Sequence, residues 1–130
     1  MRALADTSMF IAREQGRELA GETIDELPEE LVVSVVTVAE LRLGVLMAGT
    51  VQTRAQRLDT LRLVESLEPL PVDDTVASAW ARMVAELRAA GRRAPLNDSW
   101  IAATAIAHRI PVVTQDSHYD SFPWLTVVRL

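Results

Sequence analysis

The chain has 130 residues, of which 49% are apolar and 24% are charged; these values are typical of one globular domain, residues 1–130, and exclude a disordered chain. Eighteen acidic and thirteen basic residues give a formal net charge of −5, which argues against a simple basic nucleic-acid binder. Cysteine is absent and every basic residue is an arginine, which excludes disulfides, thiol catalysis, a P-loop and lysine chemistry.

The expected elements alternate between short strands and helices. In chain order we expect a strand at 2–6, a helix from Met9, a strand at 31–36, helices at 37–48 and 52–68, a connector at 69–72, a helix capped by 73–75 and stopped at Gly91, a helix from 99 to about 109, and strands at 111–114 and 125–129. Such alternation requires crossover connections and predicts an α/β fold with a parallel, helix-covered sheet.

Neither a signal peptide nor a membrane span is expected. Asp6 precedes any apolar stretch of signal-peptide length, and the apolar run 31–41 is too short to cross a bilayer. We therefore expect a cytoplasmic protein.

Four acidic residues are expected at the carboxyl edge of the sheet, where ligands bind in open parallel sheets. Asp6 ends the first strand and Glu40 lies in the first turn of the helix after the second strand. Asp98 opens the helix that precedes the strand at 111–114, and Asp116 follows that strand. This helix and the strand after it each cover roughly 16 Å in opposite directions, so Asp98 and Asp116 can share a site.

Each acid also has a purely structural interpretation. Asp6 and Asp98 match helix-capping residues, Glu40 matches a capping box with Thr37, and Asp116 matches a turn residue. Four anions on one edge nevertheless repel each other unless a cation lies among them. Carboxylate ligands without cysteine or a histidine cluster favour Mg²⁺ or Mn²⁺.

Four short motifs, in order, carry a family resemblance. They are Asp-Thr-Ser at 6–8, Val-Ala-Glu-Leu at 38–41, Asn-Asp-Ser-Trp-Ile-Ala-Ala-Thr-Ala at 97–105 and Val-Val-Thr-Gln-Asp at 112–116. The series closely resembles the PIN-domain family, in particular its small bacterial VapC-type toxins, over essentially the whole chain. The resemblance implies a three-layer α/β/α fold with a central, mostly parallel sheet. It also implies an endoribonuclease, dependent on Mg²⁺ or Mn²⁺, that hydrolyses RNA phosphodiester bonds with a metal-activated water.

The resemblance further implies site residues and partners. The residues that match the family's catalytic and metal-binding acids are Asp6, Glu40, Asp98 and Asp116, and those that match its supporting polar residues are Ser8, Asn97 and Thr114. Family members usually form homodimers and are silenced by a small VapB-type antitoxin. The family commonly carries an Asp-Phe pair where this chain has His118-Tyr119, a departure that leaves position 118 without an implied metal role.

Several residues and the function itself keep more than one interpretation. Arg92 and Arg93 precede the helix with Asp98 and are candidates for RNA phosphate contacts, or are simply solvated loop residues. Trp80 and Trp100 fit a core or an interface, whereas Trp124 is undecided between these and base stacking. The apolar faces of helices 37–48 and 52–68 fit a core, a dimer interface or an antitoxin groove. The alternatives to an RNA-cleaving enzyme are a non-catalytic PIN-like module that binds RNA or protein, and a DNA-directed nuclease of the same fold.

Overall fold

Short parallel strands form the centre of the computed structural model, which describes residues 2–16 and 30–130. The strands are β1 (Arg2–Ala5), β2 (Glu30–Val32), β3 (Val112–Thr114) and β4 (Val127–Arg129), hydrogen-bonded in the order β2-β1-β3-β4. Every pairing between them is parallel, so each connection must cross over the sheet. The predicted parallel α/β sheet is confirmed.

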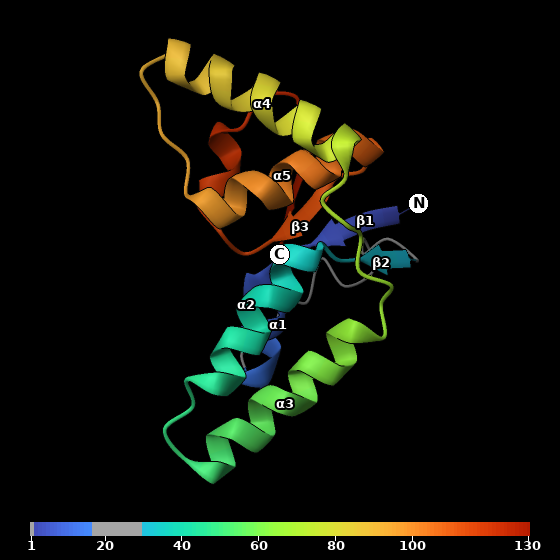
Figure 1. Ribbon diagram of the computed structural model, residues 1–130, viewed down its shortest axis with the longest axis vertical. Helices are drawn as coiled ribbons and strands as arrows, with labels where there is room; N and C mark the ends of the chain where they lie inside the picture. Colours follow the sequence, from blue (N-terminus) through green and yellow to red (C-terminus); the bar gives the residue numbers. More distant parts are fainter. Residues whose placement is uncertain (1, 17–29) are drawn as a thin grey trace.

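Helices cover both faces of this sheet. They are α1 (Thr7–Glu14), α2 (Val35–Leu46), α3 (Val51–Glu65), α4 (Asp74–Ala89), α5 (Leu96–His108) and the short 3₁₀ helix η2 (Ser117–Ser121). Figure 1 shows α4 and α5 together on one side of the strands and α1, α2 and α3 on the other, which gives the three layers. Among the described residues, no helix combines the length and apolarity that a membrane span requires.

Side chains alternate in direction along a strand, so successive residues of each strand point to opposite faces of the sheet. Both faces are covered by helices. Leu4 and Val112 pack with residues of α4 and α5 in one apolar cluster. Ala5 and Val113, their neighbours along the chain, pack with residues of α1, α2 and α3 in a second cluster. Each strand therefore contributes to two cores, which explains its continuous apolar sequence.

Several predicted boundaries were wrong by two to three residues: α1 starts at Thr7 and not at Met9, α3 ends at Glu65 and not at 68, and α5 starts at Leu96 and not at 99. The boundary between the second strand and α2 was also wrong, and a capping residue explains it. The second strand stops at Val32, and α2 starts at Val35 because the Ser34 hydroxyl caps it by accepting a hydrogen bond from Val36 N at 3.0 Å. Local capping thus converts two β-branched residues, expected in a strand, into the first turn of a helix. The long helix α4 begins after Asp73 and is followed by Gly91 at φ +71°, as predicted.

Two side chains of α4, one buried and one exposed, test the packing of this helix. Met83 is fully buried, whereas Glu86, three residues later, is exposed. We expect Met83→Ala to lower the free energy of unfolding by about 2–5 kcal/mol because it leaves a cavity, and Glu86→Ala to change it by less than about 0.5 kcal/mol. Urea denaturation followed by circular dichroism measures both. Equal losses in the two variants would contradict the packing of α4 on the sheet.

Candidate active site

Asp6 is the most deeply buried acid at the carboxyl edge of the sheet, with 3% of its surface exposed. Its Oδ1 accepts a hydrogen bond from Ser8 Oγ at 2.7 Å and its Oδ2 accepts one from Thr114 Oγ1 at 2.9 Å. Asp6 occupies the N-cap position of α1, but its side chain makes no capping hydrogen bond. Its carboxylate is therefore held by two hydroxyls from α1 and β3 and not by the helix backbone.

The surroundings of Asp6 favour its protonated form. Burial, which penalises the charged carboxylate, raises the pKa of Asp6 to about 6, and the nearby negative charges of Asp98 and Asp116 add to this rise. The hydrogen bonds from Ser8 and Thr114 act in the opposite direction. A carboxylate with this pKa is partly uncharged near neutral pH until a positive charge lies beside it.

The side chain of Glu40 is positioned by two threonines. Thr7 Oγ1 donates a hydrogen bond to Glu40 Oε1 at 2.7 Å and lies 3.0 Å from Thr37 Oγ1. Because the single Thr7 proton goes to Glu40, the Thr37 hydroxyl must donate to Thr7. The capping-box interpretation of Thr37 and Glu40 was wrong, since Ser34 caps α2 and Glu40 is the sixth residue of that helix, beyond its first turn.

Asp98 and Asp116 meet at the side chain of His118. His118 Nδ1 lies 3.2 Å from Asp98 Oδ2 and 3.2 Å from Asp116 Oδ2. Asp116 also caps η2, because its Oδ1 accepts a hydrogen bond from His118 N at 2.9 Å. The turn interpretation of Asp116 thus holds together with its place in the cluster. Asp98 lies in the first turn of α5, whose N-cap residue is Pro95.

Tyr119 connects the two parts of the site and was missed by the sequence analysis. Its side chain is fully buried, and its hydroxyl donates to Asp98 Oδ1 at 3.3 Å. Burial first, and then the negative charges of Asp6, Asp98 and Glu40, raise the pKa of the Tyr119 hydroxyl far above its ordinary value. The buried Tyr119 hydroxyl is therefore close enough to Asp6, Asp98 and Glu40 to be affected by the charge of all three.

Of the three predicted supporting residues, the structure brings two to the acids. Thr114 Oγ1 accepts a hydrogen bond from Asp116 N at 2.8 Å while it donates to Asp6, and Ser8 Oγ accepts one from Gln115 N at 3.3 Å. Asn97 is exposed in the first turn of α5, and no hydrogen bond within residues 2–16 and 30–130 links its side chain to the acids.

The donor atoms of this site fit a divalent cation. One ligand atom each from Asp98, Asp116 and His118 lies within 4.8 Å of the others. Carboxylate oxygens are preferred ligands of hard divalent ions, and imidazole nitrogen is accepted by the transition metals among them. A cation among these groups would also relieve the repulsion between Asp6, Asp98 and Asp116.

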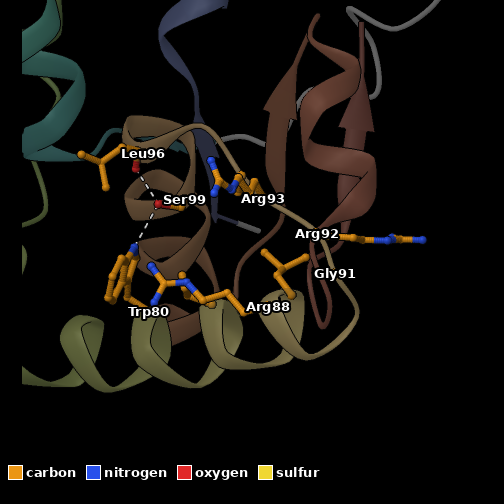
Figure 2. A pocket seen from close by; sticks show the side chains of 10 residues that line it. Trp80, Arg88, Gly91, Arg92, Arg93, Leu96 and Ser99 are labelled. Carbon is orange, nitrogen blue, oxygen red and sulfur yellow. Dashed lines mark hydrogen bonds between the residues drawn. The ribbon is translucent and has the colours of Figure 1, made fainter.

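A basic pocket lies beside the first turn of α5. It has a volume of about 550 Å³ and lies between α4, the loop after Gly91 and the residues Leu96 and Ser99 that flank Asp98. Figure 2 shows the guanidinium groups of Arg88 and Arg93 turned toward Trp80 and Ser99, whereas the side chain of Arg92 extends in the opposite direction. The predicted arginine pair therefore diverges, and Arg88, which the sequence analysis missed, lies on the side of Arg93.

The tryptophans separate into a core pair and an exposed residue. Trp80 and Trp100 are stacked, with ring centroids 4.5 Å apart, and Trp80 Nε1 donates to Ser99 Oγ at 2.9 Å. Trp124 is 58% exposed, and the guanidinium carbon of Arg82 lies 5.9 Å from the centre of its ring. The predicted packing role of Trp80 and Trp100 is confirmed.

Comparison with known proteins places this arrangement in a family. A family model described as the PIN domain matches residues 3–125. The chain belongs to the PIN-domain family. Among curated relatives, "Ribonuclease VapC4" of Mycobacterium tuberculosis is 49% identical over 133 residues, covering 99% of this chain and 97% of the relative. "Ribonuclease VapC5" of the same organism is 51% identical over 116 residues, covering 88% and 82%.

Solved structures share this PIN-domain fold. The crystal structure of VapBC-5 of Mycobacterium tuberculosis, described as a member of the VapBC family of toxin–antitoxin systems, aligns with a TM-score of 0.87 at 42% identity and covers 99% of this chain and 98% of that chain. The crystal structure of FitAcB of Neisseria gonorrhoeae aligns with a TM-score of 0.74 at 31% identity and covers 98% and 96%.

The raised pKa of Asp6 predicts a pH-dependent stability of the metal-free protein. Below about pH 4 the carboxyl is protonated in both the folded and unfolded chains and costs nothing. Between about pH 4 and pH 6 only the unfolded chain ionises, so stability falls, and above about pH 6 the full cost is present. We expect Asp6→Asn, in EDTA at pH 7, to raise the free energy of unfolding by roughly 1–3 kcal/mol, and this gain to vanish below about pH 4.

Urea titrations of both proteins at several pH values measure this difference. A variant that is less stable than the wild type in EDTA at pH 7 would show that the two hydroxyl hydrogen bonds outweigh the burial of the charge.

Proposed function

We propose that this PIN domain is an endoribonuclease of the VapC type that hydrolyses RNA phosphodiester bonds at the edge formed by Asp6, Glu40, Asp98 and Asp116. The observation that carries the proposal is the group of possible metal ligands on Asp98, Asp116 and His118, with the buried carboxylate of Asp6 close enough to Asp98 and Asp116 to be affected by their charges. The support from comparison is 49% identity, over 99% of the chain, to a relative named as a ribonuclease.

The acids have different roles in the proposed site. Asp98 and Asp116 are partly exposed, with 21% and 31% of their side chains accessible, so they can reach both a cation and a phosphate that approaches from solvent. Asp6 is buried and its position is fixed by two hydroxyls, so it supplies negative charge at a defined point with little freedom to move away. Glu40, whose Oε1 accepts a hydrogen bond from Thr7, adds a further carboxylate from α2.

The proposed cofactor is Mg²⁺ or Mn²⁺, held by these acids. Such an ion supplies Lewis-acid activation of water and stabilises charge on the scissile phosphate. The protein residues then have three tasks: to keep their ligand atoms at fixed separations, to orient the phosphate, and to neutralise its flanking charges. Ser8 and Thr114 serve the first task because they set the orientation of Asp6.

RNA is proposed to enter along the pocket between α4 and α5. The chain carries a net charge of −5, so local arginines must supply the attraction for phosphate groups. Arg88 and Arg93 face this pocket, and Ser99 on its wall is adjacent in sequence to Asp98. A phosphate bound there would lie next to the turn of α5 that carries the catalytic acid.

A VapB-type antitoxin and a homodimer complete the proposal. The solved relative with 42% identity is described as a member of a toxin–antitoxin family. Large apolar side chains near the α2–α3 connection are exposed, among them Leu46, Met47 and Val51 at 75%, 73% and 88%. Apolar surface of this kind is expected to be covered by a partner or a second copy.

Asp98→Asn tests the catalytic assignment because it removes one charge and keeps the shape. We expect cleavage of RNA in Mg²⁺ or Mn²⁺ to fall by more than about a hundredfold, since even residues that only support metal ligands are worth about ten- to a hundredfold. Asp59→Asn, on the exposed side of α3, is the matched control and is expected to retain full activity. The assay is cleavage of purified transfer and ribosomal RNA, with and without EDTA.

The outcomes separate the candidate functions. Discrete, EDTA-sensitive fragments that are absent with Asp98→Asn support the metal-dependent ribonuclease. Binding without cleavage supports a non-catalytic RNA-binding module, and cleavage of DNA instead of RNA supports a DNA-directed nuclease. Equal cleavage by the wild type and Asp98→Asn overturns the role assigned to Asp98.

Single arginine variants test the RNA path. In an Asp98→Asn background, we expect Arg93→Ala and Arg88→Ala to weaken RNA binding and to reduce the slope of log affinity against log salt by about 0.7 for each lost phosphate contact. Arg92 also lines the pocket, but its side chain extends away from Trp80 and Ser99 (Figure 2), so Arg92→Ala should change both quantities less than Arg93→Ala. Fluorescence anisotropy at several salt concentrations measures both quantities, and equal effects at Arg92 and Arg93 would refute a path through this pocket.

A further inference from the structure

His118 presents a ring nitrogen to the two most accessible acids of the site. The capping hydrogen bond from His118 N to Asp116 Oδ1, 2.9 Å long, folds the chain at the start of η2. This turn brings His118 Nδ1 to 3.2 Å from Asp98 Oδ2 and to 3.2 Å from Asp116 Oδ2. Three potential ligand atoms, from α5 and from the loop after β3, thus surround one small space.

The separations match those of ligands on a single ion. Neighbouring ligands of an octahedral cation, each about 2.0–2.2 Å from the metal, lie about 3 Å apart, and opposite ligands lie about 4.3 Å apart. The two distances from Nδ1 agree with neighbouring positions, and all three atoms lie within 4.8 Å of one another. One ion can therefore contact Asp98, Asp116 and His118 at the same time.

The other neighbours of His118 leave it free for this role. Its side chain is 57% exposed, so solvent can complete the coordination sphere. Tyr119, the next residue, points into the core and donates to Asp98 Oδ1, which leaves Asp98 Oδ2 as the oxygen that faces the imidazole. Asp98 Oδ1 thus accepts the hydrogen bond from Tyr119, and Asp98 Oδ2 faces the space in which an ion would bind.

We propose that His118 is a nitrogen ligand of the divalent-metal site, beside Asp98 and Asp116, and that this ligand makes the site prefer Mn²⁺ to Mg²⁺. The inference rests on the metal site of the proposed function. Mg²⁺ binds carboxylates and retains waters, whereas imidazole nitrogen suits the transition metals. Replacing one oxygen of the ligand set by Nδ1 therefore shifts affinity toward Mn²⁺. The competing role of His118 is structural: Nδ1–H holds the two carboxylates together and never contacts the metal.

Electron spin echo spectroscopy of the Mn²⁺-loaded protein, without RNA, distinguishes the two roles. The chain has two histidines, His108 and His118, and His108 lies at the far end of α5. We expect modulation from a directly coordinated imidazole nitrogen in the wild type and, unchanged, in His108→Asn. With His108 removed, that signal belongs to His118, so the assignment does not depend on the folding of a His118 variant.

Calorimetric titration with each ion in turn measures the metal preference. We expect His118→Asn to lose the nitrogen signal and to bind Mn²⁺ about tenfold more weakly, with less than about a threefold change for Mg²⁺. His118→Asp, which restores an oxygen ligand, should bind Mg²⁺ at least as tightly as the wild type and lower the ratio of Mn²⁺ to Mg²⁺ affinity.

The outcomes separate this inference from the proposed function. Mn²⁺ binding to the wild type without a nitrogen signal, or equal Mn²⁺ and Mg²⁺ losses in His118→Asn, overturns the ligand role of His118 and leaves the carboxylate site intact. Failure of the wild type to bind either ion overturns the metal site of the proposed function, and the ligand role with it.

Discussion

The buried carboxylate of Asp6, at the end of β1, limits how α1 and β3 can pack around it. Asp6 is 3% exposed and lies near the like charges of Asp98 and Asp116, an arrangement that costs stability when all three are ionised. It is tolerated because hydroxyls from α1 and β3 donate to both of its oxygens. β1, α1 and β3 must therefore be aligned so that the hydroxyls of Ser8 and Thr114 both reach Asp6. The parallel pairing of β1 with β3 provides this alignment for Thr114. Groups held at such a cost are typical of functional sites.

The site is built across both layers of helices. Asp6 and Glu40 are linked through residues of α1 and α2, whereas Asp98 and Tyr119 belong to α5 and η2 on the other side of the sheet. Tyr119 also packs against Phe122 within the apolar cluster of α4 and α5. The loop after β3 is thus anchored in the core at Tyr119 while His118, one residue earlier, faces solvent. Rigid packing behind the loop fixes the geometry of the exposed ligands in front of it.

The sequence allowed the parallel sheet and the positions of Asp6 and Asp116 after strand ends to be predicted, because periodicity and strand ends are local signals. The catalytic roles of the four acids stay predictions. The contacts that orient those acids are not local. Thr37 matched a capping box by spacing, yet its hydroxyl lies beside Thr7 in another helix, and only the packing of α1 on α2 reveals this. Ser34 caps α2, so the second strand ends before Val35. The strand propensity of Val35 and Val36 does not reveal this boundary. The direction of Arg92 depends likewise on the course of the loop after Gly91 (Figure 2), which local sequence signals do not determine.

Thr114 performs two functions with one hydroxyl: it donates to Asp6 and accepts from the backbone of Asp116. A single torsion angle of a single side chain thus sets the relative position of acids on two different segments. Threonine is suited to this because its branched Cβ leaves few rotamers in a strand, so little freedom is lost when both bonds form. Serine would offer the same donor and acceptor, but its unbranched Cβ leaves more rotamers accessible about χ1. Valine would have the restricted χ1 but would lack both hydrogen bonds. The alignment of Asp6 with the Asp116 segment therefore depends on the hydrogen bonds of Thr114 and also on the restricted rotation of its side chain.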